Sequence, residues 1–111
     1  MSGTLQLLAH FGLLGISLGL GIATFHDVAV VRLMFAALFW CVGYFHFADA
    51  LWIPSWGAGL DAIDRIGIAI KGVGFAMIAV SGVLSDSSLS LAIGFAGLFV
   101  IVFGRILWKS A

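Results

Sequence analysis

Four long apolar segments dominate the chain, and short polar stretches separate them. Glycines are interspersed along the segments and no two-residue alternation is present, which argues against the strands of a β-barrel. A helix that crosses the hydrocarbon core of a bilayer needs about 20 mostly apolar residues. The pattern therefore predicts an all-α integral membrane protein with one domain, a four-transmembrane-helix antiparallel bundle over residues 1–111. The predicted spans are residues 5–25, 28–53, 60–84 and 89–108.

The three breaks between these segments contain residues that favour helix ends. The first break holds Asp27, which we predict to be the N-cap of the second helix. The second break begins with Pro54, a residue that stops helices, and continues with a serine and two glycines. The third break, residues 85–88, is rich in serine and contains Asp86, so it predicts a tight turn that also offers caps.

Composition supports lipid as the solvent of this chain. Hydrophobic residues make up 63% of it and charged residues only 9%, whereas soluble domains carry about a quarter charged residues. The net charge is zero and no basic tract is present, which excludes nucleic acid as an expected partner. Almost nothing projects from the membrane, and the sequence has no CxxC, HExxH or phosphate-loop motif. We therefore expect no enzyme activity and no catalytic residues.

The distribution of basic residues predicts an orientation. An even number of spans places both termini on one side, together with Arg65, Arg105 and Lys109, while the other side has Arg32. Basic residues are enriched on the cytoplasmic side of membrane proteins. We therefore expect an integral protein of the bacterial inner (cytoplasmic) membrane, with the N- and C-termini in the cytoplasm.

The first predicted helix has two distinct faces, at about 100° per residue. A polar stripe is formed by Gln6, His10, Ser17, Gly21 and Thr24. The opposite stripe holds Gly12, Gly15 and Gly19 and includes a GxxxG motif. Small residues let helices approach closely in membranes. This packing face either serves the four helices of one chain or receives a second copy or another subunit.

Ionisable residues inside a membrane are costly and often functional. On the second predicted helix, Arg32, Phe39, Gly43 and His46 share a face. Asp49, three positions after His46, is close enough along the helix to contact it. Asp64 and Lys71 share a face of the third helix, and Lys71 leans back toward the acids. We therefore expect Asp49, Asp64 and Lys71 to form a polar site for protons or substrate, or alternatively to pair near the membrane interface.

His10 and His46 fall at similar depth on two adjacent predicted helices. Two such histidines are candidate axial ligands of a haem b, and either one alone is a candidate ligand of a chlorophyll-type pigment. The alternative is that both are buried histidines with structural partners. A metal held by His10, His46 and Asp49 would be a further use of these residues, but we predict no metal site.

The length and the four-span layout resemble those of the small multidrug-resistance transporters, which work as dimers. Those proteins carry a glutamate in the middle of the first helix, whereas the first predicted helix here contains no acidic residue. Their function is therefore not carried over to this chain.

Three functions remain as expectations. The preferred one is an accessory or scaffolding subunit of a larger membrane complex, or a homo-oligomer, whose partners are the bilayer and other membrane subunits or a second copy. The alternatives are a subunit that binds a haem or a (bacterio)chlorophyll-type pigment through histidine, and a small proton-coupled transporter that uses the polar residues of the cytoplasmic leaflet.

Overall fold

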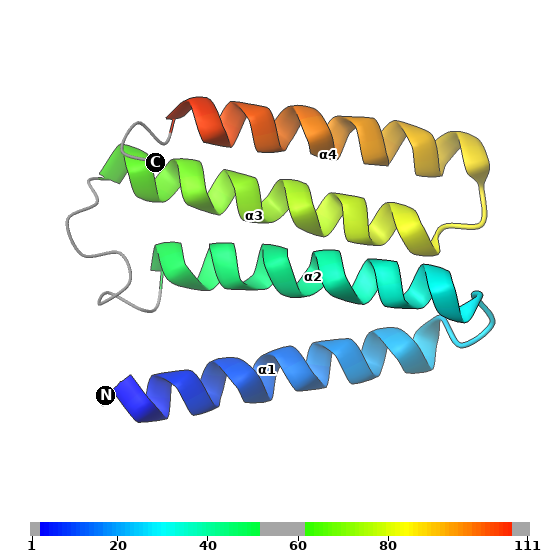
Figure 1. Cartoon of the computed structure of the whole chain (residues 1–111), viewed down its shortest axis with the longest axis horizontal. Coiled ribbons are helices and arrows are strands. Elements are labelled where there is room, and N and C mark those ends of the chain that lie inside the picture. Colours follow the sequence, from blue (N-terminus) through cyan, green and yellow to red (C-terminus); the bar gives the residue numbers. More distant parts are fainter. Residues whose placement is uncertain (1–2, 52–61, 108–111) are drawn as a thin grey trace.

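The computed structural model describes residues 3–51 and 62–107, which form four helices (Figure 1). The helices are α1 (Gly3–Thr24), α2 (Val30–Leu51), α3 (Ala62–Val83) and α4 (Ser87–Leu107). Each has 21 or 22 residues and is therefore about 32 Å long, enough to cross a hydrocarbon core of about 30 Å. All four are also apolar enough to cross a membrane. The four predicted helices are confirmed, and their ends lie within two residues of the expected positions.

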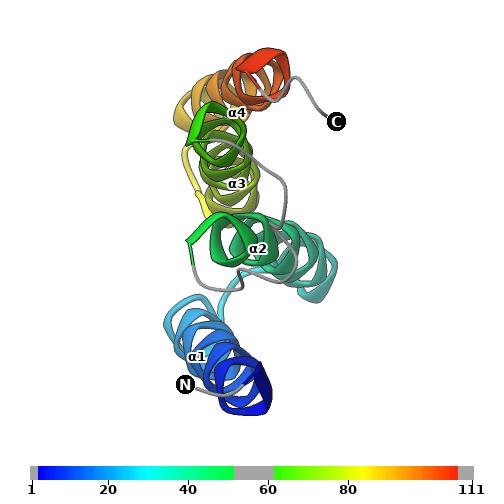
Figure 2. The same ribbon diagram turned by 90° about the vertical axis from the view of Figure 1, so that its left-hand side faces the viewer.

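The helices lie side by side in chain order and form a row one helix thick (Figures 1 and 2). Within the described part of the chain, each helix packs only against its neighbours in sequence, and the molecule measures 42 × 31 × 14 Å. The four helices therefore form an open antiparallel arrangement in a single layer. Short connections make consecutive helices neighbours, and nothing in lipid forces the ends of the row to meet, because apolar side chains are as well solvated by acyl chains as by one another.

Direct backbone contact between glycines joins the last three helices. A Cβ atom built on Gly43 of α2 would lie 2.7 Å from the carbonyl oxygen of Gly72 on α3. The same holds between α3 and α4, where a Cβ on Gly74 would lie 2.8 Å from the carbonyl oxygen of Gly97. Real Cβ atoms do not approach so closely, so both interfaces require glycine at these positions.

Large side chains, by contrast, connect α1 to α2. The Trp40 indole nitrogen Nε1 donates a hydrogen bond of 2.9 Å to Ser17 Oγ. Nearer the start of α1, the rings of Phe11 and Phe45 meet edge to face with their centroids 5.7 Å apart. The two backbones therefore stay further apart than those of α2 and α3, and α1 is the least closely packed helix of the row.

Side chains from both neighbours satisfy the C-terminal carbonyl groups of α3. Arg32 of α2 donates from Nε to Gly82 O and from Nη2 to Leu84 O, at 2.9 and 2.7 Å. Ser90 of α4 donates from Oγ to Ser81 O at 2.6 Å. The last carbonyls of a helix have no partner within it, and a cation is favourable there. These three bonds fix the end of α3 between its neighbours.

The two predicted caps have different outcomes. Asp86 Oδ1 accepts hydrogen bonds from Ser88 N and Leu89 N, so the predicted cap of α4 is confirmed. Asp27 does not cap α2, because that helix begins three residues later at Val30. Asp27 instead lies 3.2 Å from His26 Nε2 in the exposed turn.

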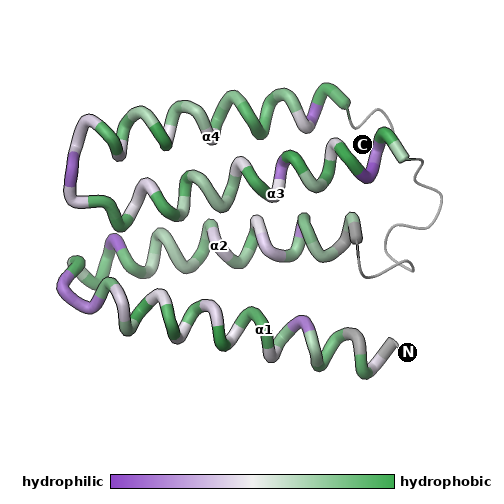
Figure 3. The backbone as a smooth tube through the Cα atoms, turned by 180° about the vertical axis from the view of Figure 1, so that it is seen from behind, coloured by the Kyte–Doolittle hydropathy of each residue, from purple (hydrophilic) through white to green (hydrophobic). Residues whose placement is uncertain are grey.

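Strongly hydrophilic positions gather at the two described turns and in the half of the row that holds the start of α1 (Figure 3). The other positions are mainly apolar, as contact with the hydrocarbon core of a membrane requires.

Candidate functional site

His10 is buried between α1 and α2. Its side chain is only 1% exposed, and its Nδ1 atom lies 3.4 Å from the Tyr44 hydroxyl oxygen. The two rings meet edge to face with centroids 6.0 Å apart. His10, a member of the polar stripe on α1, therefore faces α2.

His46 lies on the other side of α2. Its Nδ1 atom is 2.8 Å from the carbonyl oxygen of Val42, and because that oxygen can only accept, Nδ1 carries the proton and Nε2 presents a lone pair. The ring also lies against Phe75 of α3, with centroids 5.1 Å apart. His46 therefore belongs to the interface between α2 and α3.

The two histidines do not share a ligand site. Tyr44, which contacts His10, and His46 are two positions apart on α2 and so point about 200° apart around the helix. Both histidines lie at a similar level along the helices, because Tyr44 and His46 belong to the same turn of α2. The pair of axial ligands expected for a haem b is not formed, because the body of α2 lies between the two imidazoles.

The structure describes the side chains of two residues of the candidate polar site, Asp64 and Lys71. Lys71 faces α4, where a Cβ built on Gly104 would lie 2.9 Å from Lys71 Cγ. Asp64 is buried in the first turn of α3. Asp49 belongs to α2, but its side chain lies outside the part that the structure describes. Within the described residues, no three His, Cys, Asp or Glu side chains are grouped closely enough to hold a metal ion.

The glycines of the predicted packing face contact no other helix within the described chain. A Cβ atom built on Gly12, Gly15 or Gly19 would have no atom within 4 Å. This surface, here named the glycine edge, is the outer side of α1 at one end of the row. The sequence left two uses open for this face, packing within the chain or contact with another chain. Within the described chain, these glycines do not take part in the packing.

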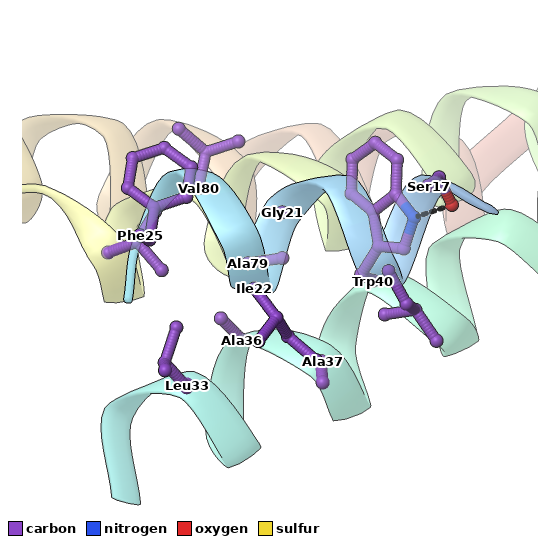
Figure 4. Close-up of a pocket in the computed structure, with 12 residues that line it drawn as sticks. Ser17, Gly21, Ile22, Phe25, Leu33, Ala36, Ala37, Trp40, Ala79 and Val80 are labelled. Atoms are coloured by element: carbon purple, nitrogen blue, oxygen red, sulfur yellow. Dashed lines mark hydrogen bonds between the residues drawn. The ribbon is translucent and has the colours of Figure 1, made fainter. Parts of the chain in front are cut away.

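An apolar groove, which the sequence did not indicate, opens between α1, α2 and α3 (Figure 4). Its volume is about 270 Å³. Small residues leave this space, among them Gly21 on α1, Ala36 and Ala37 on α2, and Ala79 on α3. The remaining lining residues are Ser17, Leu18, Ile22, Phe25, Leu33, Trp40, Val80 and Val83. Small residues on three helices were the available signal, but only the arrangement of the helices shows that they meet.

The fold and the site define a row of four helices that are long and apolar enough to cross a membrane. Comparison with known proteins adds no relative, since no family model, curated protein or solved structure matches the chain.

Proposed function

We propose that this chain is an integral membrane protein that acts as an accessory or scaffolding subunit of a larger membrane complex, or as a homo-oligomer. In this proposal the glycine edge, Gly12, Gly15 and Gly19, receives a helix of the neighbouring subunit. In this proposal the chain inserts in the bacterial inner membrane with both termini in the cytoplasm. The orientation follows from the positive-inside rule, because Arg65 and Arg105 lie at the same ends of their helices as the start of α1.

The observation that carries the proposal is the contrast between two sets of glycines. Gly43, Gly72, Gly74 and Gly97 each meet a neighbouring backbone, whereas the glycine edge has no atom near it. Close backbone approach between small residues is the main source of helix association in lipid, where no hydrophobic effect drives it. The glycine edge has the same composition as the interfaces inside the chain, and this supports its use between chains.

The test is the size of the assembly extracted from the native membrane in mild detergent. The wild-type chain of 11.7 kDa is expected to migrate in a larger complex, either with itself or with a stoichiometric membrane partner. A Gly15→Leu substitution should release it as a monomer, because the larger side chain prevents backbone approach.

The matched control is Ala96→Leu, an exposed position on α4, which should leave the complex intact. A wild-type chain that migrates as a monomer, or a complex unchanged by Gly15→Leu, would contradict the proposal.

A second candidate function rests on His46. A backbone carbonyl that orients Nδ1–H and leaves Nε2 as a lone pair is the arrangement found behind metal-ligating histidines, and here the acceptor is Val42 O. This supports ligation of a haem or a chlorophyll-type pigment by one histidine. The absorption spectrum of the protein purified from its own membrane tests it. A visible band lost in His46→Ala but kept in Arg32→Ala supports the pigment, and a colourless protein excludes it.

A further inference from the structure

The groove between α1, α2 and α3 extends over one half of the membrane-spanning part of the chain. It begins near the turn between α1 and α2, at Phe25 and Leu33, and ends at Ser17 and Trp40, which lie near the middle of their helices. Phe25, directly after the last residue of α1, is eight positions from Ser17, which corresponds to about 12 Å along the helix axis. The hydrocarbon of one leaflet is about 15 Å thick. In a membrane the groove thus extends from the interface to the depth where the two leaflets meet.

The lining of the groove has no affinity for a polar group. Its two polar side chains are Ser17 and Trp40, and they satisfy each other. Ser17 Oγ accepts a hydrogen bond of 2.9 Å from Trp40 Nε1 (Figure 4). It also donates one of 2.9 Å to the carbonyl oxygen of Leu14. All the other lining residues are aliphatic, aromatic or glycine. A ligand therefore gains nothing here from hydrogen bonds and has to be apolar over its buried length.

The size of the groove distinguishes between the apolar occupants that a membrane offers. A whole helix is about 10 Å across, and α1 and α2 cannot separate by that width while the Trp40–Ser17 hydrogen bond and the Phe11–Phe45 ring contact join them. A helix of another chain therefore does not enter it. A single alkyl chain is narrow enough, and the depth of the groove corresponds to one leaflet. An empty groove of this size would forfeit dispersion contacts along its walls.

We propose that this groove holds one acyl chain of a bilayer lipid from the leaflet nearest the turn between α1 and α2. The chain lies between α1 and the α2/α3 pair, with its end near the Trp40 indole, and it supplies packing that the sparse contact between α1 and α2 does not. The inference rests on insertion of the four helices in a membrane, but it does not require association through the glycine edge.

Gly21 provides the means to fill the groove. It lines the groove, and a Cβ atom built on it would have no atom within 4 Å. A Gly21→Leu side chain therefore starts in open space at its Cβ atom and extends into the groove. Ala37→Leu fills the same groove from α2. Ala23→Leu is the matched control, because Ala23 is exposed on the same turn of α1 and is outside the lining.

The experiment uses Trp40 as a reporter in the full chain. The chain has four tryptophans, so Trp52, Trp56 and Trp108 are replaced by Phe. The protein is reconstituted in phosphatidylcholine vesicles with a rising fraction of lipid whose acyl chains are brominated near their ends, since bromine quenches tryptophan fluorescence on contact. Quenching of Trp40 is expected to fall by about half in Gly21→Leu and in Ala37→Leu, because the new side chain removes the acyl chain from contact with the indole. Ala23→Leu should leave it unchanged.

Circular dichroism shows whether each variant keeps its helices. If Gly21→Leu loses helicity, Gly21→Ala replaces it, because its single methyl group meets open space. Equal quenching in the filling variants and in the control would overturn the proposal. A filling variant that dissociates an assembly of copies without changing the quenching would also overturn it, since a neighbouring chain would then cover the groove. Gly15→Leu does not alter the groove, so failure of the glycine edge and failure of the lipid site are distinguishable.

Discussion

Glycine has two different surroundings in this chain. At Gly43 and Gly72 the two backbones touch, and each residue would place a Cβ atom within 2.8 Å of the other's carbonyl oxygen. At Gly15 and Gly19 the same residue type faces open space. An added methyl group therefore has opposite consequences at the two kinds of position, which makes them a matched pair for measurement.

Gly43→Ala should destabilise the fold by about 1–3 kcal/mol, the usual cost of overpacking a close contact. In the monomeric chain, Gly19→Ala should be neutral or stabilise by up to about 1 kcal/mol, since alanine is the better helix former. Equilibrium unfolding in mixed micelles measures both free energies. Similar values for the two variants would show that α2 and α3 are not in backbone contact.

Arg32 is the residue that connects α2 to the end of α3. Arg32→Ala removes two donors from the Gly82 and Leu84 carbonyls and should lower the free energy of unfolding by about 1 kcal/mol, because the side chain is exposed and its bonds are partly replaced by water. The free energy of unfolding of Arg32→Lys should lie between those of the wild type and Arg32→Ala. An ammonium keeps the favourable charge at the helix end but lacks the planar fork of a guanidinium. If Arg32→Lys is no more stable than Arg32→Ala, the charge at the end of α3 does not matter.

At the scale of the element, α1 differs from the other three helices. It is held by side chains such as Trp40 and Tyr44 that cross a wider gap, whereas the other interfaces are made by backbone contact. Hydrogen bonds between membrane helices contribute about 0.6 kcal/mol on average. The attachment of α1 thus depends on a small number of modest interactions.

The bond between Ser17 and Trp40 should show this dependence in a double-mutant cycle. Ser17→Ala, Trp40→Phe and the double variant are unfolded in the same micelles, and the coupling energy is expected to be about 0.6 kcal/mol. The pair Phe39→Leu and Ser17→Ala is the control, because Phe39 packs on Phe75 of α3 and not on α1. A coupling energy near zero for Ser17 and Trp40 would show that their hydrogen bond does not stabilise the α1/α2 interface.

The sequence predicted the helices well, but it did not predict which face of each helix meets which neighbour. The length of an apolar run determines where a membrane helix begins and ends, so the described ends of the four helices agree with the predicted spans within two residues. The face shared by Arg32, Phe39, Gly43 and His46 was also predictable, and all four contact α3. The periodicity of one helix does not say which helix its face meets. For that reason neither the separation of His10 from His46 nor the groove beside Gly21 could be predicted.

At the scale of the whole molecule, large hydrophobic side chains are exposed on all four helices, and hydrophilic positions lie toward both ends of the helices (Figure 3). This distribution is compatible with insertion in either direction. The basic residues Arg65 and Arg105 lie on the same side as the start of α1, and the positive-inside rule predicts that this side faces the cytoplasm. The orientation is therefore a separate prediction from the fold.

Single cysteines placed in a Cys41→Ser background test this orientation. An impermeant maleimide added to intact cells should label a cysteine at Ser85, in the turn before α4, and should not label one at Ser110. Permeabilised cells should show both labels, which controls for reactivity. Labelling of Ser110→Cys alone in intact cells would place the termini outside.

Because the row is only one helix thick, copies of this chain can assemble only in certain ways. A single row has two unlike edges, in the way that an open β-sheet has two edge strands. The α1 edge is lined by glycine, while the α4 edge carries bulky side chains such as Phe99, which is 75% exposed. Two α1 edges can meet about a twofold axis, which leaves only the bulky edges outward and closes the assembly. Head-to-tail growth needs an α1 edge against an α4 edge, where the bulky side chains of α4 prevent close approach of the two backbones. Self-association through the glycine edge therefore stops at two copies and does not continue into a filament.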